Sequence, residues 1–189
     1  MTVTLKDGLF TFGTNEVVQI PPDLTASPYG SIANTNDAEQ KAPLGILYRH
    51  KGNVYRYVQY EAGQDAVAAA AGGVVHWYSL DPANGKFVVT GDFSDSGGAS
   101  VGAKNLCAGI LGCVVTDQYY TWIQVGGVVL LAKVNTSNAA GDVMIYSNTD
   151  LTFGRCAADA AVTGTPFGVA LAVDNPSGFG PVLLLNMIF

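Results

Sequence analysis

Three segments of the chain share one pattern of apolar and polar positions. A glycine opens a short apolar run, a polar turn follows, and a second apolar or aromatic run ends the segment, as in residues 44–60 (LGILYRHKGNVYRYVQY), 108–125 (AGILGCVVTDQYYTWIQV) and 167–185 (FGVALAVDNPSGFGPVLLL). The runs alternate and are rich in β-branched and aromatic residues, which is typical of amphipathic strands. The turns contain Gly, Asn, Asp or Pro, which favour chain reversal. The pattern therefore predicts three β-hairpins.

A second motif recurs between these hairpins. Residues 70–79 (AAGGVVHWYS) and 139–147 (AAGDVMIYS) share small residues, a glycine and a run that ends in an aromatic residue and serine. Both motifs recur in the same order at a spacing of about 60 residues, which indicates duplication of one β unit. Turns are expected at residues 81–86, where an Asn-Gly step suits a hairpin, and at residues 147–150, just before a run at 151–153.

Helix signals are nearly absent, and residues 62–71 (AGQDAVAAAA) are predicted to form a short helix or a turn. We therefore expect an all-β fold, an antiparallel barrel or sandwich built from two related hairpin modules and a closing hairpin. The modules are assigned to residues 44–107 and 108–166, and the closing hairpin to residues 167–189.

The first 43 residues differ from the rest. They contain Pro21, Pro22 and Pro28, followed by a polar stretch without either period at residues 31–41. A segment of this kind cannot bury a core of its own, so we interpret it as an extended N-terminal arm that gains order on a partner surface. A disordered tail is the alternative. The polar loop at residues 92–105 is expected to be an exposed connection between the modules.

Composition adds an expectation about assembly. Of the 189 residues, 49% are hydrophobic and 13% are charged, whereas an ordinary soluble domain has about 25% charged residues. Such a balance predicts that another chain covers part of the apolar surface, and we expect a homo-oligomer, most simply a trimer. A compact all-β monomer rich in Val, Ala and Gly is the alternative interpretation.

Charge and hydropathy exclude several partners. The net charge is −6 and the pI about 4.6, so phosphates of nucleic acids and anionic lipids would be repelled. No apolar run approaches the roughly 20 residues of a membrane helix. The first residues lack the features of a secretory signal, so synthesis in the cytoplasm is expected.

Groups that could carry chemistry are few. The three cysteines lack metal-ligand spacing and are predicted to be reduced, packed thiols, with a Cys107 to Cys113 disulfide as the alternative. His50 is expected at the surface in a turn, and His76 on a strand face with a packing partner. No motif of a known nucleophile, phosphate loop or dinucleotide site occurs. We therefore expect no enzyme activity, no cofactor and no metal.

Carboxylates leave one catalytic alternative open. A hydrolase could use two of the aspartates that fall in turns, although an aspartate that bonds the following backbone amides explains such positions without catalysis. The loop at residues 92–98 has alternating oxygen ligands but lacks the glutamate of an EF-hand. The turn aspartates are Asp81, Asp92, Asp95, Asp117 and Asp174.

Tyrosine and tryptophan gather in the predicted strands, and alternation assigns only about half of them to a core. Such residues often anchor protein interfaces or stack on sugars. The candidate partner-binding residues, from the arm and from these strands, are Pro21, Pro22, Pro28, Tyr29, Tyr57, Tyr120 and Trp122.

Over residues 44–189, the segments AGILGCVVTDQYYTWIQVGG, AAGDVMIYS and FGVALAVDNPSGFGPVLLLN resemble the head decoration, or cement, proteins of tailed bacteriophages. The resemblance implies an all-β protein, commonly trimeric, that sits on the outer surface of the capsid and clamps neighbouring major capsid subunits. The arm would then be the part that contacts the lattice. A receptor-binding or glycan-binding module of a virion fibre is the alternative, with Tyr119, Tyr120 and Trp122 as a sugar platform.

Overall fold

The computed structural model describes residues 9–12, 16–19, 35–94, 107–134, 137–145, 149–156 and 166–185. The described part of the chain is all-β as expected, with one turn of 3-10 helix at Pro82–Asn84. The strands are β1 (Leu9–Phe12), β2 (Glu16–Gln19), β3 (Leu47–His50), β4 (Asn53–Glu61), β5 (Val74–Asp81), β6 (Lys86–Thr90), β7 (Cys107–Leu111), β8 (Tyr120–Lys133), β9 (Val143–Ile145), β10 (Gly154–Cys156), β11 (Pro166–Ala170) and β12 (Phe179–Leu184).

Five strands close into a barrel, which we call the first ring. Strand β4 pairs with β6, β6 with β5, β5 with β7 and β7 with β8, and β8 returns to β4. Only the pair of β4 with β6 is parallel. Side chains alternate along a strand, so Val58 and Tyr60 of β4 point into the core and pack with Trp77, and each of these three is at most 1% exposed. The predicted, mainly antiparallel barrel is confirmed.

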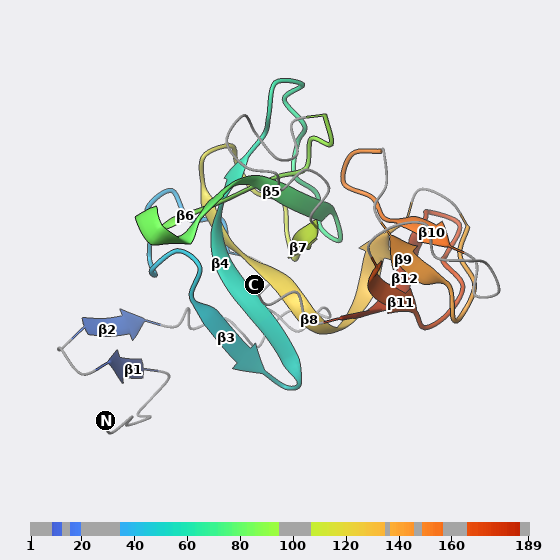
Figure 1. Ribbon diagram of the computed structural model, residues 1–189, viewed down its shortest axis with the longest axis horizontal. Helices are drawn as coiled ribbons and strands as arrows, with labels where there is room; N and C mark the ends of the chain where they lie inside the picture. Colours follow the sequence, from blue (N-terminus) through green and yellow to red (C-terminus); the bar gives the residue numbers. More distant parts are fainter. Residues whose placement is uncertain are drawn as a thin grey trace.

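A second set of strands, the second ring, lies beside the first (Figure 1). Strand β8 pairs with β12, β12 with β11, β11 with β9 and β9 with β10. A single parallel bridge joins Val134, just after β8, to Phe153, just before β10, and closes the second ring. The long strand β8 belongs to both rings and bends near Gly127, whose positive φ of 86° and contact with Asn53 leave no room for a side chain.

The same pairings recur in the two rings when β4 to β8 of the first are matched in order with β8 to β12 of the second. The register recurs too, because Val75 lies opposite Gly109 and Met144 lies opposite Gly168. These glycines are the ones that open two of the predicted hairpins. The module boundaries drawn from the sequence stay a prediction, since β8 is shared.

The first hairpin turns through Lys51 and Gly52, both with positive φ (46° and 84°), which is the type I′ geometry that suits a two-residue loop. The β7 to β8 and β11 to β12 pairs confirm the other two predicted hairpins. Residues 62–71 contain turns instead of a helix. Strand β10 begins at Gly154, not at residue 151, because the turn extends through Leu151 with φ 57°.

The N-terminal arm also differs from the expectation of a purely extended segment. Strands β1 and β2 pair antiparallel as a hairpin within it. At its other end, residues 35–43 lie against the first ring, where Asp37 forms a bridge with Tyr120. Part of the predicted arm is therefore docked on its own chain.

Candidate interaction surface

Aromatic side chains cover the outer wall of the first ring. Tyr55 and Tyr57 alternate with inward-facing residues of β4, and Tyr57 lies opposite Trp122 on β8. The centroids of the aromatic rings of Tyr57 and Trp122 are 5.1 Å apart. Tyr57 and Trp122 are only 0% and 4% exposed. Alternation assigned about half of the aromatic residues to an outer face, and these two lie on that face but are buried.

The cover is residues 35–46, which we call the strap. The backbone N–H of Asp37 donates to Tyr120 O (3.0 Å), and the N–H of Tyr120 donates back (2.9 Å). The hydroxyl of Tyr57 donates to Asp37 Oδ2 (3.0 Å) and accepts from the N–H of Lys41 (3.1 Å). Burial raises the pKa of Tyr57, so the phenol stays protonated and can donate at neutral pH.

Among the candidate partner-binding residues, the structure therefore brings Tyr57, Tyr120 and Trp122 together. Tyr57 and Trp122 lie under the strap and Tyr120 is half-buried. The other candidates, Pro21, Pro22, Pro28 and Tyr29, lie outside the described residues. Contact of any of these with a partner stays a prediction.

A row of apolar residues crosses four strands on the outer face of the second ring. Ladder pairs place Val143 opposite Val169, Val169 opposite Leu183, and Leu183 opposite Val128. Residues directly opposite each other in a ladder share a face. Leu183 and Val128 are 38% and 39% exposed, and Leu171 and Leu185, which flank Leu183 on the same face, are each 45% exposed. We call these residues the apolar face: Val128, Val143, Val169, Leu171, Leu183 and Leu185.

The same ladder positions are covered in the first ring. There the row is Val74, Ile110 and Gln124, which pair as Val143, Val169 and Leu183 do. Val74 and Ile110 are at most 2% exposed because they belong to the core of the second ring. The second ring therefore covers this face of the first ring. The equivalent face of the second ring is the exposed apolar face.

The sequence carries a signal for this face that the alternation argument missed. Residues 128–131 (VVLL) and 182–185 (VLLL) are continuous apolar runs. A strand with one solvated face alternates, whereas a continuous run indicates that both faces lack water. No charged residue occurs at 126–132, 166–173 or 178–189.

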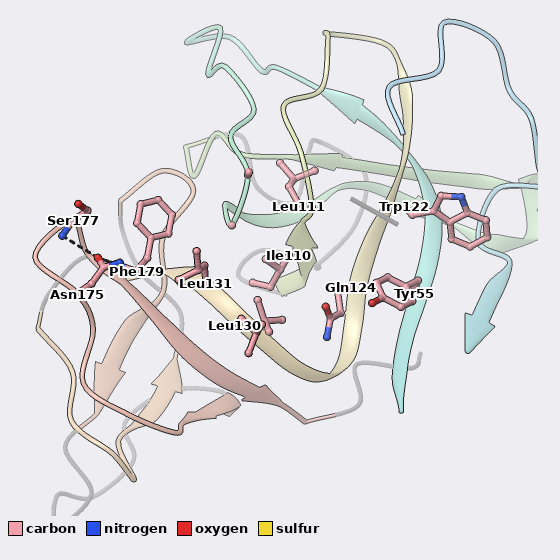
Figure 2. A pocket seen from close by; sticks show the side chains of 14 residues that line it. Tyr55, Ile110, Leu111, Trp122, Gln124, Leu130, Leu131, Asn175, Ser177 and Phe179 are labelled. Atoms are coloured by element: carbon pink, nitrogen blue, oxygen red, sulfur yellow. Dashed lines mark hydrogen bonds between the residues drawn. The ribbon is translucent and has the colours of Figure 1, made fainter. Parts of the chain in front are cut away.

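A cavity of about 390 Å³ lies where the two rings meet (Figure 2). Its walls include Tyr55 and Gln124 of the first ring and Leu130 and Phe179 of the second. The amide of Gln124 donates to Gly126 O and Val128 O, both at 3.1 Å, and so holds the bend of β8. Leu130 on its wall is 53% exposed, and the lining is largely apolar.

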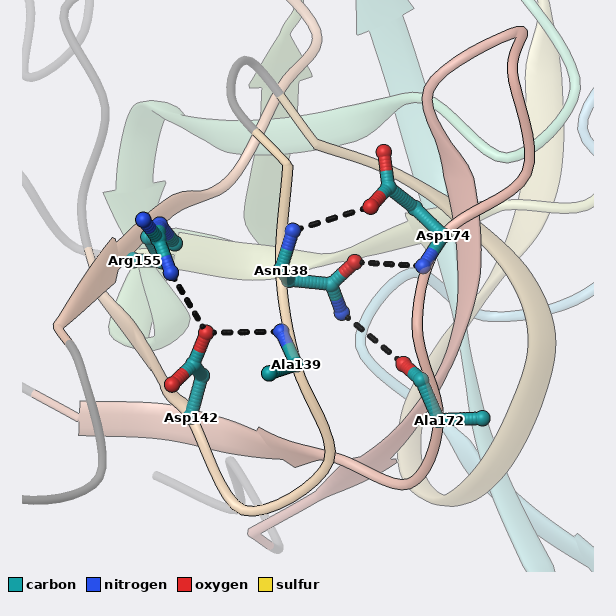
Figure 3. Close-up of polar contacts among 6 residues, drawn as sticks. All are labelled: Asn138, Ala139, Asp142, Arg155, Ala172 and Asp174. Carbon is teal, nitrogen blue, oxygen red and sulfur yellow. Dashed lines mark hydrogen bonds and ion pairs between the residues drawn. The ribbon is translucent and has the colours of Figure 1, made fainter.

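A polar clasp joins two loops at the end of the second ring (Figure 3). Asn138 is 3% exposed. Its side chain accepts from the N–H of Asp174 (2.8 Å) and donates to Ala172 O (3.2 Å), while its own N–H donates to Asp174 Oδ1 (2.9 Å). Nearby, Asp142 Oδ2 accepts from Arg155 at 3.0 Å. The clasp positions the loops that border the apolar face.

The turn aspartates bond backbone amides, but only Asp81 and Asp92 bond amides that follow them, as the non-catalytic interpretation expects. Asp92 accepts from the following N–H of Ser94 and also from the N–H of Asp65. Asp117 and Asp174 accept instead from the distant N–H groups of Ala62 and Asn138. Asp81 accepts from Asn84, and Asp95 lies outside the described residues. Within the described ranges, no group of three or more His, Cys, Asp or Glu could hold a metal ion.

Histidines and cysteines have structural surroundings. His76 is 1% exposed and packs edge-on against Phe93, and burial lowers its pKa to about 4. His50 was expected to be exposed in a turn, but it is half-buried at the end of β3, because its imidazole stacks on the aromatic ring of Tyr48. The cysteines are free thiols, so Cys107 and Cys113 form no disulfide.

Comparisons with known proteins assign the chain to no family. No family model matches the chain, and no curated protein matches it. One solved structure that matches is the N base of the head fibre gp8.5 of bacteriophage phi29, with 11% sequence identity, a TM-score of 0.46, and coverage of 72% of this chain and 98% of that chain. At this identity and TM-score the overlap assigns no function. Among the described residues, no helix is long and apolar enough to cross a membrane.

Proposed function

We propose that this chain is a structural protein of a tailed-phage virion that binds the outer surface of the capsid and stabilises the shell. The proposal rests on the apolar face of the second ring and on the resemblance of residues 44–189 to decoration proteins. The corresponding face of the first ring is buried against the second ring. An exposed apolar patch at the same position of the second ring supports a role in binding another protein. In this proposal the major capsid protein supplies the cover.

The physical basis of stabilisation is preferential binding. A protein that binds the assembled, expanded lattice more tightly than free subunits shifts the equilibrium toward the lattice. No catalytic step is needed, and we propose that the chain is not an enzyme. Its uncharged face also avoids the repulsion that a chain of net charge −6 would meet at an acidic surface.

The strap argues against the glycan-binding alternative. A sugar platform needs exposed aromatic faces, whereas Trp122 is 4% exposed and Tyr119 and Tyr120 are half-buried. The strap also changes the choice of arm deletion, because removing residues 1–42 would uncover the Tyr57 and Trp122 cluster. A deletion of residues 1–34 tests the arm and leaves the strap in place.

Co-sedimentation with expanded and unexpanded phage shells tests the proposal. We expect the full chain to sediment with expanded shells and to raise their thermal stability. Leu183→Asp should weaken this binding at least about tenfold, because a buried, unpaired carboxylate costs several kcal/mol in an apolar contact. Val114→Asp is the matched control, since Val114 is 65% exposed between β7 and β8, away from the apolar face.

Two outcomes would overturn the proposal. The first is a chain that sediments with neither kind of shell. The second is a Leu183→Asp variant that binds as tightly as the unchanged chain, which would leave the apolar face without a role in shell binding.

A further inference from the structure

Strand β3 has a free edge, and the sheet of β1 and β2 has no further strand among the described residues. Strand β3 ends the larger sheet and pairs there only with β4, while β1 and β2 form a separate two-stranded sheet. A two-stranded sheet alone is marginally stable in water, and a free strand edge is a template for further pairing. Each of the two sheets therefore offers a strand edge to the other.

The order of strand pairings recurs three times along the chain, in units of four strands. The first two strands of each unit pair antiparallel, as β1 with β2, β5 with β6 and β9 with β10. The last two strands also pair antiparallel, as β3 with β4, β7 with β8 and β11 with β12. Strand β1 is therefore the counterpart of β5 and β9, and β3 is the counterpart of β7 and β11.

One pairing of this order is absent from the first unit as the structure describes it. In the other two units the first strand pairs antiparallel with the third, β5 with β7 and β9 with β11. The second residue of the first strand then lies opposite the glycine of the hairpin, as Val75 lies opposite Gly109 and Met144 opposite Gly168. The same register would place Phe10, the second residue of β1, opposite Gly45.

The backbone of β3 presents the groups that this pairing needs. The hairpin closes at the pair of His50 with Asn53, so the backbone groups of Leu47 point away from β4. Leu47 lies two positions after its hairpin glycine and is 40% exposed. At the same place in the other units, Leu111 and Ala170 each exchange two backbone bonds of 2.8 to 2.9 Å with the residues that precede β5 and β9.

We propose that β1 docks antiparallel on the free edge of β3 of the same chain and so completes a third copy of the repeated unit. Strand β1 then lies between β2 and β3, with Leu9 opposite Ile46 and Phe10 opposite Gly45. The two sheets are separate in the structure, so docking is a movement of the hairpin toward the first ring. This inference goes beyond the proposed function and needs no shell, so its failure and the failure of shell binding are observed separately.

The chain is long enough for β1 to reach β3 of its own molecule. Residues 20–34 connect β2 to the strap and can span up to about 50 Å. Asp37 of the strap is joined to Leu47 by three ladder pairs and three residues of β4, a path of about 25 Å. A tethered strand also meets its own edge at a higher effective concentration than a strand of another molecule does.

An engineered disulfide in the full chain tests the proposed register. Leu9→Cys and Ile46→Cys are combined in one chain, because the pair of residues 9 and 46 is the non-hydrogen-bonded kind, whose Cα atoms approach to about 4.5 Å and permit a disulfide. After mild oxidation we expect a bond within the monomer, identified by peptide mass spectrometry. Leu9→Cys with His50→Cys is the matched control, since Ile46 and His50 are both half-buried and lie on the same side of the chain.

Three outcomes of the oxidation would overturn the proposal. The first is the absence of a bond between positions 9 and 46. The second is equal bonding of position 9 to positions 46 and 50, which an undocked arm would give. The third is a bond that forms only between molecules when the single variants are mixed, because a second copy would then occupy the edge.

Hydrogen exchange of the unchanged chain gives an independent measure. The amides of Leu47 and Arg49 both point to the free edge, but only Leu47 lies within the proposed contact. We expect the Leu47 amide to exchange at least about tenfold more slowly than the Arg49 amide. Equal rates would overturn the proposal.

Two variants at one position of β1 connect this protection to docking. Phe10→Pro should abolish the protection of the Leu47 amide, because a strand with neighbours on both sides does not tolerate proline. Phe10→Val is the control and should retain the protection, since the corresponding residue of β5 is Val75. Protection of Leu47 that persists in the proline variant would also overturn the proposal.

Discussion

The two rings have the same strand pairings but opposite outer surfaces. In the first ring, the outer wall is closed by the strap over Tyr57 and Trp122 and by the second ring over Val74 and Ile110. In the second ring, the corresponding row is less covered, because Leu183 is 38% exposed and Val143 and Val169 are half-buried. A duplicated β unit can thus keep its ladder while its outer face changes role. The ladder depends on backbone pairing, whereas the outer face depends only on side chains.

The interiors differ as well. The first ring holds large aromatic and polar groups, including Arg56, whose guanidinium lies 5.6 Å from the Trp77 ring and 5.9 Å from the Phe87 ring. Burial lowers the pKa of Arg56. The second ring holds mainly aliphatic side chains with Met144 and Phe153. We expect the first ring to contribute more to stability and the second to association.

The largest expected effect tests the first half of that contrast. Trp77→Ala should lower the free energy of unfolding by about 4 kcal/mol, because it removes a fully buried aromatic side chain and leaves a cavity. Urea denaturation measures it. Tyr78→Ala is the matched control, since the neighbouring Tyr78 is only half-buried. Equal losses in the two variants would contradict the idea that the ring interior dominates stability.

A buried histidine makes the first ring sensitive to acid. The pKa of His76 is lowered to about 4 from 6.5 by burial, so the unfolded chain binds a proton that the folded chain excludes. Stability should be fully present above pH 6.5 and fall as the pH drops toward 4, by roughly 3 kcal/mol in all. Denaturation between pH 4 and 7.5 measures the slope.

The control for this slope is His76→Leu, which cannot bind a proton. The difference between the two pH profiles isolates the histidine from the carboxylates that titrate in the same range. Profiles that stay parallel between pH 4 and 6.5 would show that His76 is not the group responsible.

The third effect concerns the clasp of the second ring. Asn138 occupies the position that Ala69 has in the matching segment of the first ring, where Ala69 packs in the core at 4% exposure. Asn138→Ala should cost about 2 kcal/mol, because it removes two side-chain hydrogen bonds and leaves the N–H of Asp174 unpaired. Hydrogen exchange should show the loss in residues 166–185 and not in the first ring. Uniform loss would mean that the rings unfold together.

Alternation and turn chemistry predicted the three hairpins of residues 44–185 and the strands β5, β6 and β9, but not β1, β2 or the start of β10. The repeat of glycine-opened runs predicted the hairpins that begin with β3, β7 and β11. Ring closure could not be predicted in this way, because the parallel pair of β4 with β6 joins residues that no local pattern links. The strap was missed for a related reason, since its polar residues bury little surface and are held by backbone and side-chain bonds to distant Tyr57 and Tyr120.

The candidate site was predicted less well than the fold. Aromatic residues were weighted as interface anchors, yet Tyr57 and Trp122 are covered by the chain itself. The apolar face consists of Val and Leu, which are as common in a core as on an interface. Only the continuity of the runs at residues 128–131 and 182–185 distinguishes it. Exposure is a property of the whole fold, so it cannot be read from residue type alone.

The smallest effect on folding separates stability from association most sharply. Leu183→Gln gives the second ring the residue that Gln124 provides at the matching position of the first. Because Leu183 is 38% exposed, its replacement should change the free energy of unfolding by less than about 0.5 kcal/mol. The same change should weaken shell binding, since it removes apolar area from the face.

The reciprocal variant, Gln124→Leu, should behave in the opposite way. It removes the two hydrogen bonds that the Gln124 amide donates at the bend of β8, at a cost of about 1 to 2 kcal/mol, and leaves the apolar face unchanged. Thermal unfolding and shell co-sedimentation of both variants give four values. A Leu183→Gln chain that loses stability but keeps its binding would mean that this residue serves the fold, and the contrast between a covered ring and an open ring would fail.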